Sequence, residues 1–269
     1  MFFSHLHPQL HLPTTSVPQV QVEPSFIAKK LFTQATNDEL ARDLFGWSSN
    51  LLLTIRGLKD GFFSSLVHFL CLLANNAKLI PHSALLLLTS GLITPLNKLS
   101  LAEQKEAKEC GAAPKVRPIN SGTLFSQVIL SSVLSTPEGK QAASSTLPQQ
   151  LALGTSRGTE KLIHICRAAH GRKYLIGKND FQNGFNSISR QAMLNSHAKC
   201  FPEAVDVFNA FYGYKAPVYV LDSNGELTIL SSEQGSRQGC SAGTESFCIT
   251  LDPLLKRLQI SYPEFELNP

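Results

Sequence analysis

The chain has 269 residues, of which 43% are hydrophobic and 16% are charged, and its formal net charge is +4. This composition excludes a disordered chain and describes a globular protein that can bury a sizeable core in one large domain or two smaller ones. The net charge is too small to identify a partner. The six cysteines lack CxxC spacing, which argues against a disulfide scaffold and indicates a reducing, intracellular compartment.

The N-terminal third is predicted to be helical after an irregular start. Residues 1–24 are rich in Pro, His and Gln and carry no signal-peptide pattern. From Pro24 to about Leu88, apolar residues recur at helical spacing, which predicts a bundle of short helices. Asn37-Asp38-Glu39 is expected to begin one of them, because acidic groups are favoured at the positive end of the helix dipole.

Two stretches in this region and just beyond it, 62–73 and 84–96, are the most apolar of the chain. Both are shorter than the ~20 residues that a membrane span requires. We therefore expect a buried helix and strand there, and no membrane partner.

The middle of the chain is predicted to form a pair of strands. Gly91–Lys98 and Lys115–Ile119 are strand-like, and Pro118 confines the second strand to an edge or an end because proline has no N–H to donate. The charged stretch 102–109 between them is expected to be an exposed helix. Residues 135–150, rich in Ser, Thr, Gln and Pro, are expected to be a loop or the boundary between two lobes.

A helix predicted over 159–169 lies in a basic stretch. Between residues 157 and 178 the chain has six lysines and arginines against one acidic residue, Glu160. Such a stretch suits the phosphate backbone of a nucleic acid, although a solvated protein surface has the same composition.

The last third is predicted to alternate strands and helices. Tyr174–Asp180 is strand-like, Ser189 is expected to cap a helix with Met193 and Leu194 on its buried side, and Pro202 suits the first turn of another.

A hairpin and a helix are predicted to follow. Val218–Leu221 and Leu227–Leu230 flank an Asn-Gly pair, which tolerates the positive φ of a tight hairpin turn. A glycine-containing turn at 235–239 then leads into a helix over 243–258. This succession predicts an α+β fold with helices packed on one face of a sheet.

The first candidate site residue is Asp180, at the end of its predicted strand. A carboxylate there is the hard oxygen ligand that Mg²⁺ prefers, and phosphoryl transfer uses Mg²⁺ to neutralise the triphosphate. The alternative is an aspartate that caps a turn. Phe185 follows five residues later and could form a floor under a sugar, with Gly184 letting backbone N–H groups approach phosphate; the alternative is a core phenylalanine.

Further candidates precede and follow this segment. Gln238-Gly239 offers an amide and a flexible backbone just before a helix start, whose N–H groups attract anions. Lys98 and Arg117 lie on the two strands predicted in the middle of the chain, and both could bind a triphosphate. Taken singly, a cation of this kind is more often a solvated surface charge.

In this order and spacing, these motifs resemble the reverse transcriptases of non-LTR retrotransposons over roughly residues 85–260. The segments that carry the resemblance are Leu92–Lys98, Val116–Ile119, Gly154–Lys161, Asp180–Arg190, Ser231–Gly239 and Leu251–Leu258.

The resemblance implies a right-hand polymerase fold, with fingers at 85–170 and part of a palm, an incomplete sheet packed on helices, at 171–269, after an irregular and helical region at 1–84. It further implies Mg²⁺, a template–primer of RNA and DNA, deoxynucleoside triphosphates and, plausibly for this family, a nuclear location. The implied roles are Asp180 as the catalytic, metal-binding aspartate with the Phe181 carbonyl beside it, Phe185 next to Gly184 as the sugar-discriminating aromatic, Gln238 and Gly239 as the nucleotide-facing turn, and Lys98 and Arg117 as triphosphate cations.

Two departures from the family pattern affect the expected activity. Cys240-Ser241 replaces the usual Asp-Pro after Gln-Gly, and the aromatic-X-Asp-Asp segment of the family is absent from these 269 residues. Asp222 and Asp252 are poor substitutes, the first at a predicted hairpin tip and the second inside a predicted helix. One carboxylate cannot anchor two ions about 3.5–4 Å apart. We therefore expect a retroelement-derived reverse-transcriptase domain, an RNA-directed DNA polymerase by ancestry, that is an incomplete enzyme by itself.

Other functions fit the same sequence. One is a non-catalytic nucleic-acid-binding or protein-interaction module on a polymerase scaffold. Another is a helical interaction protein that binds through residues 1–90. A viral RNA-dependent RNA polymerase shares the palm chemistry, but the aromatic Phe185 favours deoxynucleotides.

Overall fold

The computed structural model describes residues 10–37, 42–58, 61–97, 99–111, 116–146, 150–151, 153, 155–178, 180–181, 183–222 and 224–263. Its elements mix helix with one four-stranded sheet, as the α+β prediction requires. In chain order they are α1 (Pro24–Ala35), α2 (Ser49–Gly57), α3 (Phe62–Asn75), the 3₁₀ helix η1 (Ala77–Leu79), α4 (His82–Thr89), β1 (Gly91–Asn97), α5 (Leu101–Glu109), β2 (Val116–Gly122), α6 (Leu124–Val133), α7 (Pro137–Ser144), α8 (Gly158–Gly171), α9 (Gly184–Ser187), α10 (Arg190–Cys200), η2 (Pro202–Ala204), α11 (Val205–Tyr212), β3 (Ala216–Leu221), β4 (Leu227–Ser232) and α12 (Gly243–Ser261).

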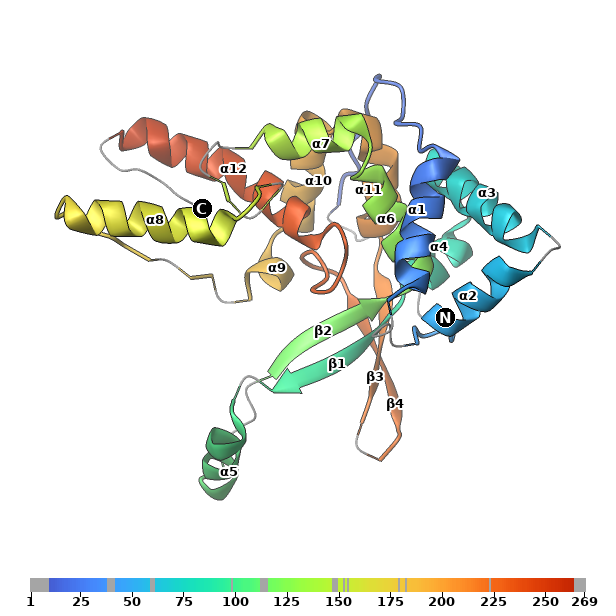
Figure 1. The fold of residues 1–269 in the computed structure, drawn as a ribbon, viewed down its shortest axis with the longest axis horizontal. Coiled ribbons are helices and arrows are strands. Elements are labelled where there is room, and N and C mark those ends of the chain that lie inside the picture. The colour runs from blue at the N-terminus through green and yellow to red at the C-terminus, as the bar shows by residue number, and fades with distance from the viewer. Residues whose placement is uncertain are drawn as a thin grey trace.

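The sheet has the order β2-β1-β3-β4 and consists of two hairpins joined at their bases (Figure 1). β1 and β2 are antiparallel along their whole length, as are β3 and β4. Between the hairpins, β1 and β3 are parallel and pair only from Gly91–Ile93 to Val218–Val220. The predicted pairing of β1 with β2 and of β3 with β4 is therefore confirmed. Pro118 lies on the edge strand β2, as expected.

Beyond their bases the hairpins diverge and project from the helical body, with α5 at the tip of the first (Figure 1). α4 packs on β3 at the base of the sheet. The residues of β4 from Leu227 to Ser231 are exposed on both faces of the strand. The expected packing of helices on the sheet is therefore seen at its base, where α4 contacts β3, and the far ends of the hairpins extend beyond the helices.

The predicted N-terminal bundle is confirmed by α1 to α4. Pro24 begins α1 and the Ser48 side chain accepts a hydrogen bond from the Leu51 N–H at the start of α2. Ile27, Leu31 and Leu70 are fully buried in the core that these helices form. The expected helix start at Asp38-Glu39 lies outside the described residues.

In the part of the chain that the structure describes, no single helix is long and apolar enough to cross a membrane. α2 and α3 reach that length and hydropathy only when taken together, across a bend of 118°.

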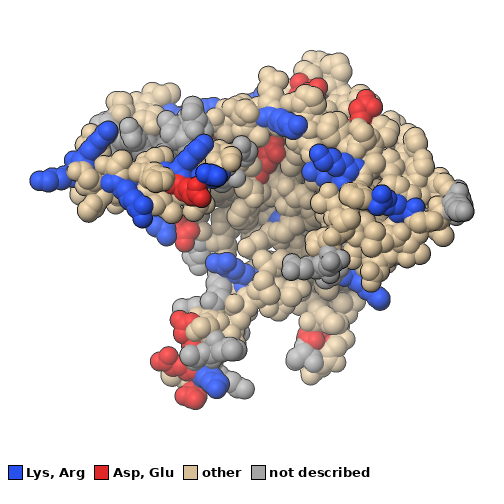
Figure 2. All heavy atoms as spheres, viewed as in Figure 1, with Lys and Arg blue, Asp and Glu red and all other residues tan. Residues whose placement is uncertain are grey.

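The predicted helix at 159–169 is confirmed as α8, which extends at one end of the molecule (Figure 1). Gly158 is the only buried residue of this helix. Its basic side chains are exposed, and Figure 2 shows Lys and Arg gathered over this end. The following segment, 174–178, forms no strand, and Leu175 is 103% exposed. The strand predicted there is wrong, because no described strand lies beside it to share hydrogen bonds.

The loop predicted at 135–150 is also wrong, since it contains α7. The Thr136 side chain accepts a hydrogen bond from the Gly139 N–H, Pro137 takes the first position, and Glu138 lies in the first turn. These helix-start features outweigh the Ser- and Thr-rich composition, and Ala142 anchors the helix in the core.

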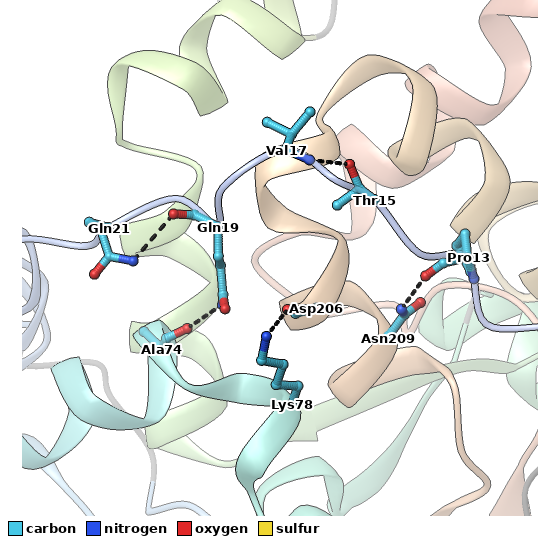
Figure 3. Close-up of polar contacts among 9 residues, drawn as sticks. All are labelled: Pro13, Thr15, Val17, Gln19, Gln21, Ala74, Lys78, Asp206 and Asn209. Carbon is cyan, nitrogen blue, oxygen red and sulfur yellow. Dashed lines mark hydrogen bonds and ion pairs between the residues drawn. The ribbon is translucent and has the colours of Figure 1, made fainter.

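Residues 10–23 are irregular, as predicted, but they form a strap across two groups of helices (Figure 3). The Asn209 side chain of α11 donates to the Pro13 carbonyl at 2.8 Å, and the Gln19 side chain donates to the Ala74 carbonyl of α3 at 3.1 Å. The strap therefore holds the N-terminal helices against α11.

Candidate functional site

A cleft of about 450 Å³ with polar and apolar walls lies at the base of the sheet. This volume lies within the range of about 300–1,000 Å³ that is usual for small-molecule sites. The lining comes from both hairpins, from α9 and from the turn after β4: Ile93, Pro118, Asn120, Asn186, Val218, Leu230, Ser231, Ser232, Glu233, Gln234, Arg237 and Gln238. The predicted nucleotide-facing residue Gln238 therefore lines this cleft.

Backbone hydrogen bonds join three segments that are distant in sequence around the cleft. The Ser236 N–H donates to the Phe185 carbonyl at 2.8 Å, and the Gly235 N–H donates to the Ile188 carbonyl at 3.0 Å. On the other side, the Asn120 N–H of β2 donates to the Gln238 carbonyl at 2.8 Å. The turn at 233–239 is thus fixed between α9 and the first hairpin.

Gly239 permits the close approach between this turn and β2. Its φ is +106°, in the region that favours glycine, and an added Cβ would lie 2.6 Å from the Asn120 carbonyl oxygen. The Gly239 carbonyl also accepts a hydrogen bond from the Gln127 side chain at 2.8 Å. A larger residue at this position would push the turn away from the strand.

The Phe185 side chain belongs to an aromatic cluster with α12. Its ring centroid lies 5.1 Å from that of Phe247, and the Phe181 centroid lies 6.1 Å from the same ring. Gly184 packs against this cluster, since an added Cβ would lie 3.1 Å from Phe247. The neighbour Asn186, not the Phe185 ring, lines the cleft, so Phe185 reaches the site through its backbone and through packing.

Two buried arginines support the turn, and sequence analysis did not identify them as site residues. Arg190 is 3% exposed; its Nε donates to the Gly235 carbonyl at 3.2 Å, Nη1 to the Ser232 and Tyr214 carbonyls, and Nη2 to the Ser232 Oγ. Arg190, Leu194 and His197 lie on the same buried face of α10. Their helical spacing is the sequence signal that could have indicated a buried arginine.

Arg237 carries the second part of this support. Its guanidinium donates to the carbonyl of Thr89, the last residue of α4, and to the Phe211 carbonyl of α11 at 3.0 Å. Arg190 and Arg237 also stack over the Tyr212 ring, at 5.6 and 5.1 Å from its centroid. The turn is therefore tied to α4, α10 and α11.

The electrostatics of this cluster follow from its burial. Burial lowers the pKa of Arg190 to about 10, with the charge of Arg237 as the next cause. Burial raises the pKa of Tyr212, whose hydroxyl donates to the Cys240 sulfur at 2.9 Å. Glu233, which lines the cleft, forms an ion pair with Lys215 at 2.9 Å.

The predicted metal-binding and triphosphate residues lie apart from this cleft or outside the described residues. Asp180 is exposed, follows no strand, and is not among the cleft lining. The expectation that it stands at the end of a strand is therefore wrong. Arg117 is exposed on β2 and pairs with Leu96, toward the free end of the hairpin. Lys98 lies outside the described residues.

The carboxylates of the described chain do not fit a two-ion magnesium site. Within its described residues the structure has no group of three His, Cys, Asp or Glu side chains that could hold a metal ion. Asp252 is buried in α12 and pairs with Lys256 at 2.6 Å. Asp222 accepts hydrogen bonds from the Asn224 and Glu226 N–H groups at the tip of the second hairpin. Both carboxylates are therefore engaged by groups near them in sequence.

Neither a protein-family model nor a curated protein matches the chain.

Proposed function

We propose that the chain is a retroelement-derived reverse-transcriptase-like domain, with fingers and part of a palm on a right-hand polymerase scaffold. The observation that carries the proposal is the cleft. It is lined by segments that resemble three polymerase motifs, in β2, in residues 184–190 and in residues 231–239, and these segments are hydrogen-bonded to one another.

In this proposal the cleft binds a nucleotide on a template–primer. Asn120, Asn186 and Gln238 bring amide side chains to its wall, and amides both donate and accept hydrogen bonds, as nucleobase edges do. Ile93 and Val218 add apolar surface for the flat face of a base or for a sugar.

Polymerisation by the 269-residue polypeptide alone is not part of the proposal. Two-metal phosphoryl transfer requires carboxylates around two ions about 3.5–4 Å apart. Asp180 is the one carboxylate that the resemblance supplies, and the described carboxylates Asp222 and Asp252 have other partners.

The test is binding of a fluorescently labelled RNA–DNA primer–template, measured by anisotropy with and without a deoxynucleoside triphosphate and Mg²⁺. We expect the triphosphate to strengthen binding, and we expect Gln238→Ala to reduce this gain by about fivefold, the value of one hydrogen bond. Gln141→Ala, an exposed glutamine on α7, is the matched control. Absence of any triphosphate effect would contradict the proposed cleft.

Primer extension is measured in the same samples. We expect none. If the wild-type polypeptide extends the primer and Asp180→Ala does not, the chain is an active polymerase and the expectation of inactivity is wrong.

A second candidate function, a non-catalytic nucleic-acid-binding module, is favoured by the exposed basic side chains on and around α8 (Figure 2). For this function, RNA affinity should fall steeply with salt and should not respond to triphosphate or to Gln238→Ala. In the double variant Lys161→Ala/Arg167→Ala, the slope of log affinity against log salt concentration should become less negative by about 1.4. This value corresponds to about 0.7 for each lost contact to a phosphate of a single strand.

A further inference from the structure

A second cavity lies among the N-terminal helices and shares no lining residue with the cleft. Its volume is about 280 Å³, and it is bounded by the loop at 43–47, by α3 and α4, and by the start of α6. The described walls are aromatic or aliphatic except for Asp43 and Thr123.

Aromatic rings from three elements form one side of this cavity. The Trp47 ring centroid lies 4.8 Å from that of Phe125, and the Phe69 centroid lies 6.5 Å from the same ring at 69°. Phe45 and Phe69 keep 51% and 49% of their surface exposed although both are large and apolar. Concave apolar surface of this kind, rather than scattered single residues, is typical of a binding site.

The two polar residues in the wall have their hydrogen-bonding groups occupied. The Asp43 Oδ1 accepts from the Phe45 and Trp47 N–H groups at 2.9 Å each, and Oδ2 accepts from the Leu124 N–H at 2.8 Å. The Thr123 hydroxyl donates to the Leu88 carbonyl at 2.9 Å and accepts from Ser126. An anionic ligand would therefore find no free donor in this wall and would face the Asp43 carboxylate, so its lost hydration would not be compensated.

The same hydrogen bonds make the cavity preformed. The Asp43 N–H donates to the Trp47 carbonyl at 3.0 Å and the Gly46 N–H donates to the Asp43 carbonyl at 3.0 Å, so the loop closes on itself. The bond from Leu124 attaches this loop to the first residue of α6. A site that is already ordered loses little conformational freedom when a ligand binds.

We infer that this cavity binds a small, uncharged, aromatic or polycyclic apolar molecule. The aromatic wall selects a flat ring, the wall offers no free donor to an anion, and the volume fits a compound of two or three rings. The site is independent of the proposed polymerase-like cleft, and its test does not depend on nucleic acid.

The probe is N-phenyl-1-naphthylamine, an uncharged apolar fluorophore that brightens on leaving water, titrated against the full chain. We expect saturable binding of one molecule per chain with a Kd on the order of 10 μM, as for a fragment-sized ligand. Phe69→Ala should weaken binding at least about fivefold through the loss of ring contacts. Phe62→Ala is the matched control, since Phe62 lies on the same helix with the same 49% exposure but outside the cavity lining.

A filling variant separates the cavity from general apolar adsorption. Ala84 lines the cavity and is half-buried on α4. Ala84→Phe adds apolar surface but occupies the space, so it should abolish binding while leaving the thermal unfolding midpoint unchanged or raised. Non-saturable binding, equal weakening by Phe62→Ala and Phe69→Ala, or full binding by a folded Ala84→Phe protein would each overturn the inference.

Discussion

Replacing Arg190 by lysine tests whether a buried guanidinium holds the turn that shapes the cleft. Arg190 makes four hydrogen bonds, which reach Ser232 and Gly235 around the turn and Tyr214 after α11. A lysine ammonium keeps the charge but concentrates its donors at one point, so it cannot reach acceptors that surround a planar fork. Arg190→Lys therefore changes the geometry of the site at constant charge.

The magnitude follows from the bonds that lysine cannot replace. If two of the four are lost, at about 1.5 kcal/mol for each bond to a charged group, the free energy of unfolding falls by about 3 kcal/mol. Urea unfolding with linear extrapolation measures this change. Hydrogen exchange adds a local reading, because the Ser236 amide is bonded to the Phe185 carbonyl and should exchange faster when the turn loosens.

The control is Arg167→Lys, which makes the same substitution at an exposed position on α8 and should change stability by less than about 0.5 kcal/mol. If Arg190→Lys were as stable as the control, and if the Ser236 amide kept its protection, the guanidinium would not be what holds the turn.

Three further predictions concern buried groups and backbone conformation. Burial lowers the pKa of His197 to about 3, below its ordinary 6.5. The stability that neutral His197 contributes is therefore present above pH 6.5 and falls as pH drops toward 3, by up to about 1.4 kcal/mol per pH unit. In urea unfolding, the free energy of unfolding of His197→Gln should fall less steeply with pH over that window, and an equal fall would assign the pH dependence to other groups. Burial raises the pKa of Glu245 to about 8, so the stability contributed by its neutral carboxyl is fully present below about pH 4.5 and is lost as pH rises through 8. Glu245→Gln should therefore be more stable than wild type at pH 8.5 but not at pH 4.5, and an equal stability difference at both pH values would refute the burial effect. Gly235 has a φ of +69° and an added Cβ would lie 2.5 Å from the Asn186 carbonyl, whereas Gly225 has a φ of +82° with nothing within 4 Å. Gly225→Ala should lower the free energy of unfolding by about 1–2 kcal/mol through backbone strain alone. Gly235→Ala should lower it further through the added steric clash, and equal losses would show that the turn has room to relax.

Local signals predicted those elements whose partners are close in sequence. The Asn-Gly pair before β4 placed the second hairpin, and Ser189 capped α10 as expected, with its side chain accepting from the Ala192 N–H. Pro118 placed β2 at an edge because the missing N–H cannot serve a second neighbour. In each case one residue determines a backbone bond within a few positions of itself.

The errors occur where the outcome depends on distant partners. Residues 174–176 have the apolar, β-favouring composition of a strand, but a strand also requires a neighbour, and the described sheet has none beside them. Likewise the spacing of Gln238 and Gly239 indicated a turn near a helix, but nothing in it indicated that Arg237 would bond to Thr89 and Phe211. Of the predicted site residues, Gln238 lines the cleft, and the arginines that support its turn were visible only in three dimensions.

The cleft and the segment that carries Asp180 are therefore held in different ways. The turn at 233–239 is fixed by backbone bonds to Phe185, Ile188 and Asn120 and by two buried arginines, none of which involves Asp180. Asp180 lies after an exposed segment without strand structure. The shape of the cleft does not depend on the position of that carboxylate, so the proposed binding in the cleft can be tested separately from the catalytic role that the resemblance implies for Asp180. Binding of a nucleotide is consequently the more direct test of the proposed ancestry than polymerisation.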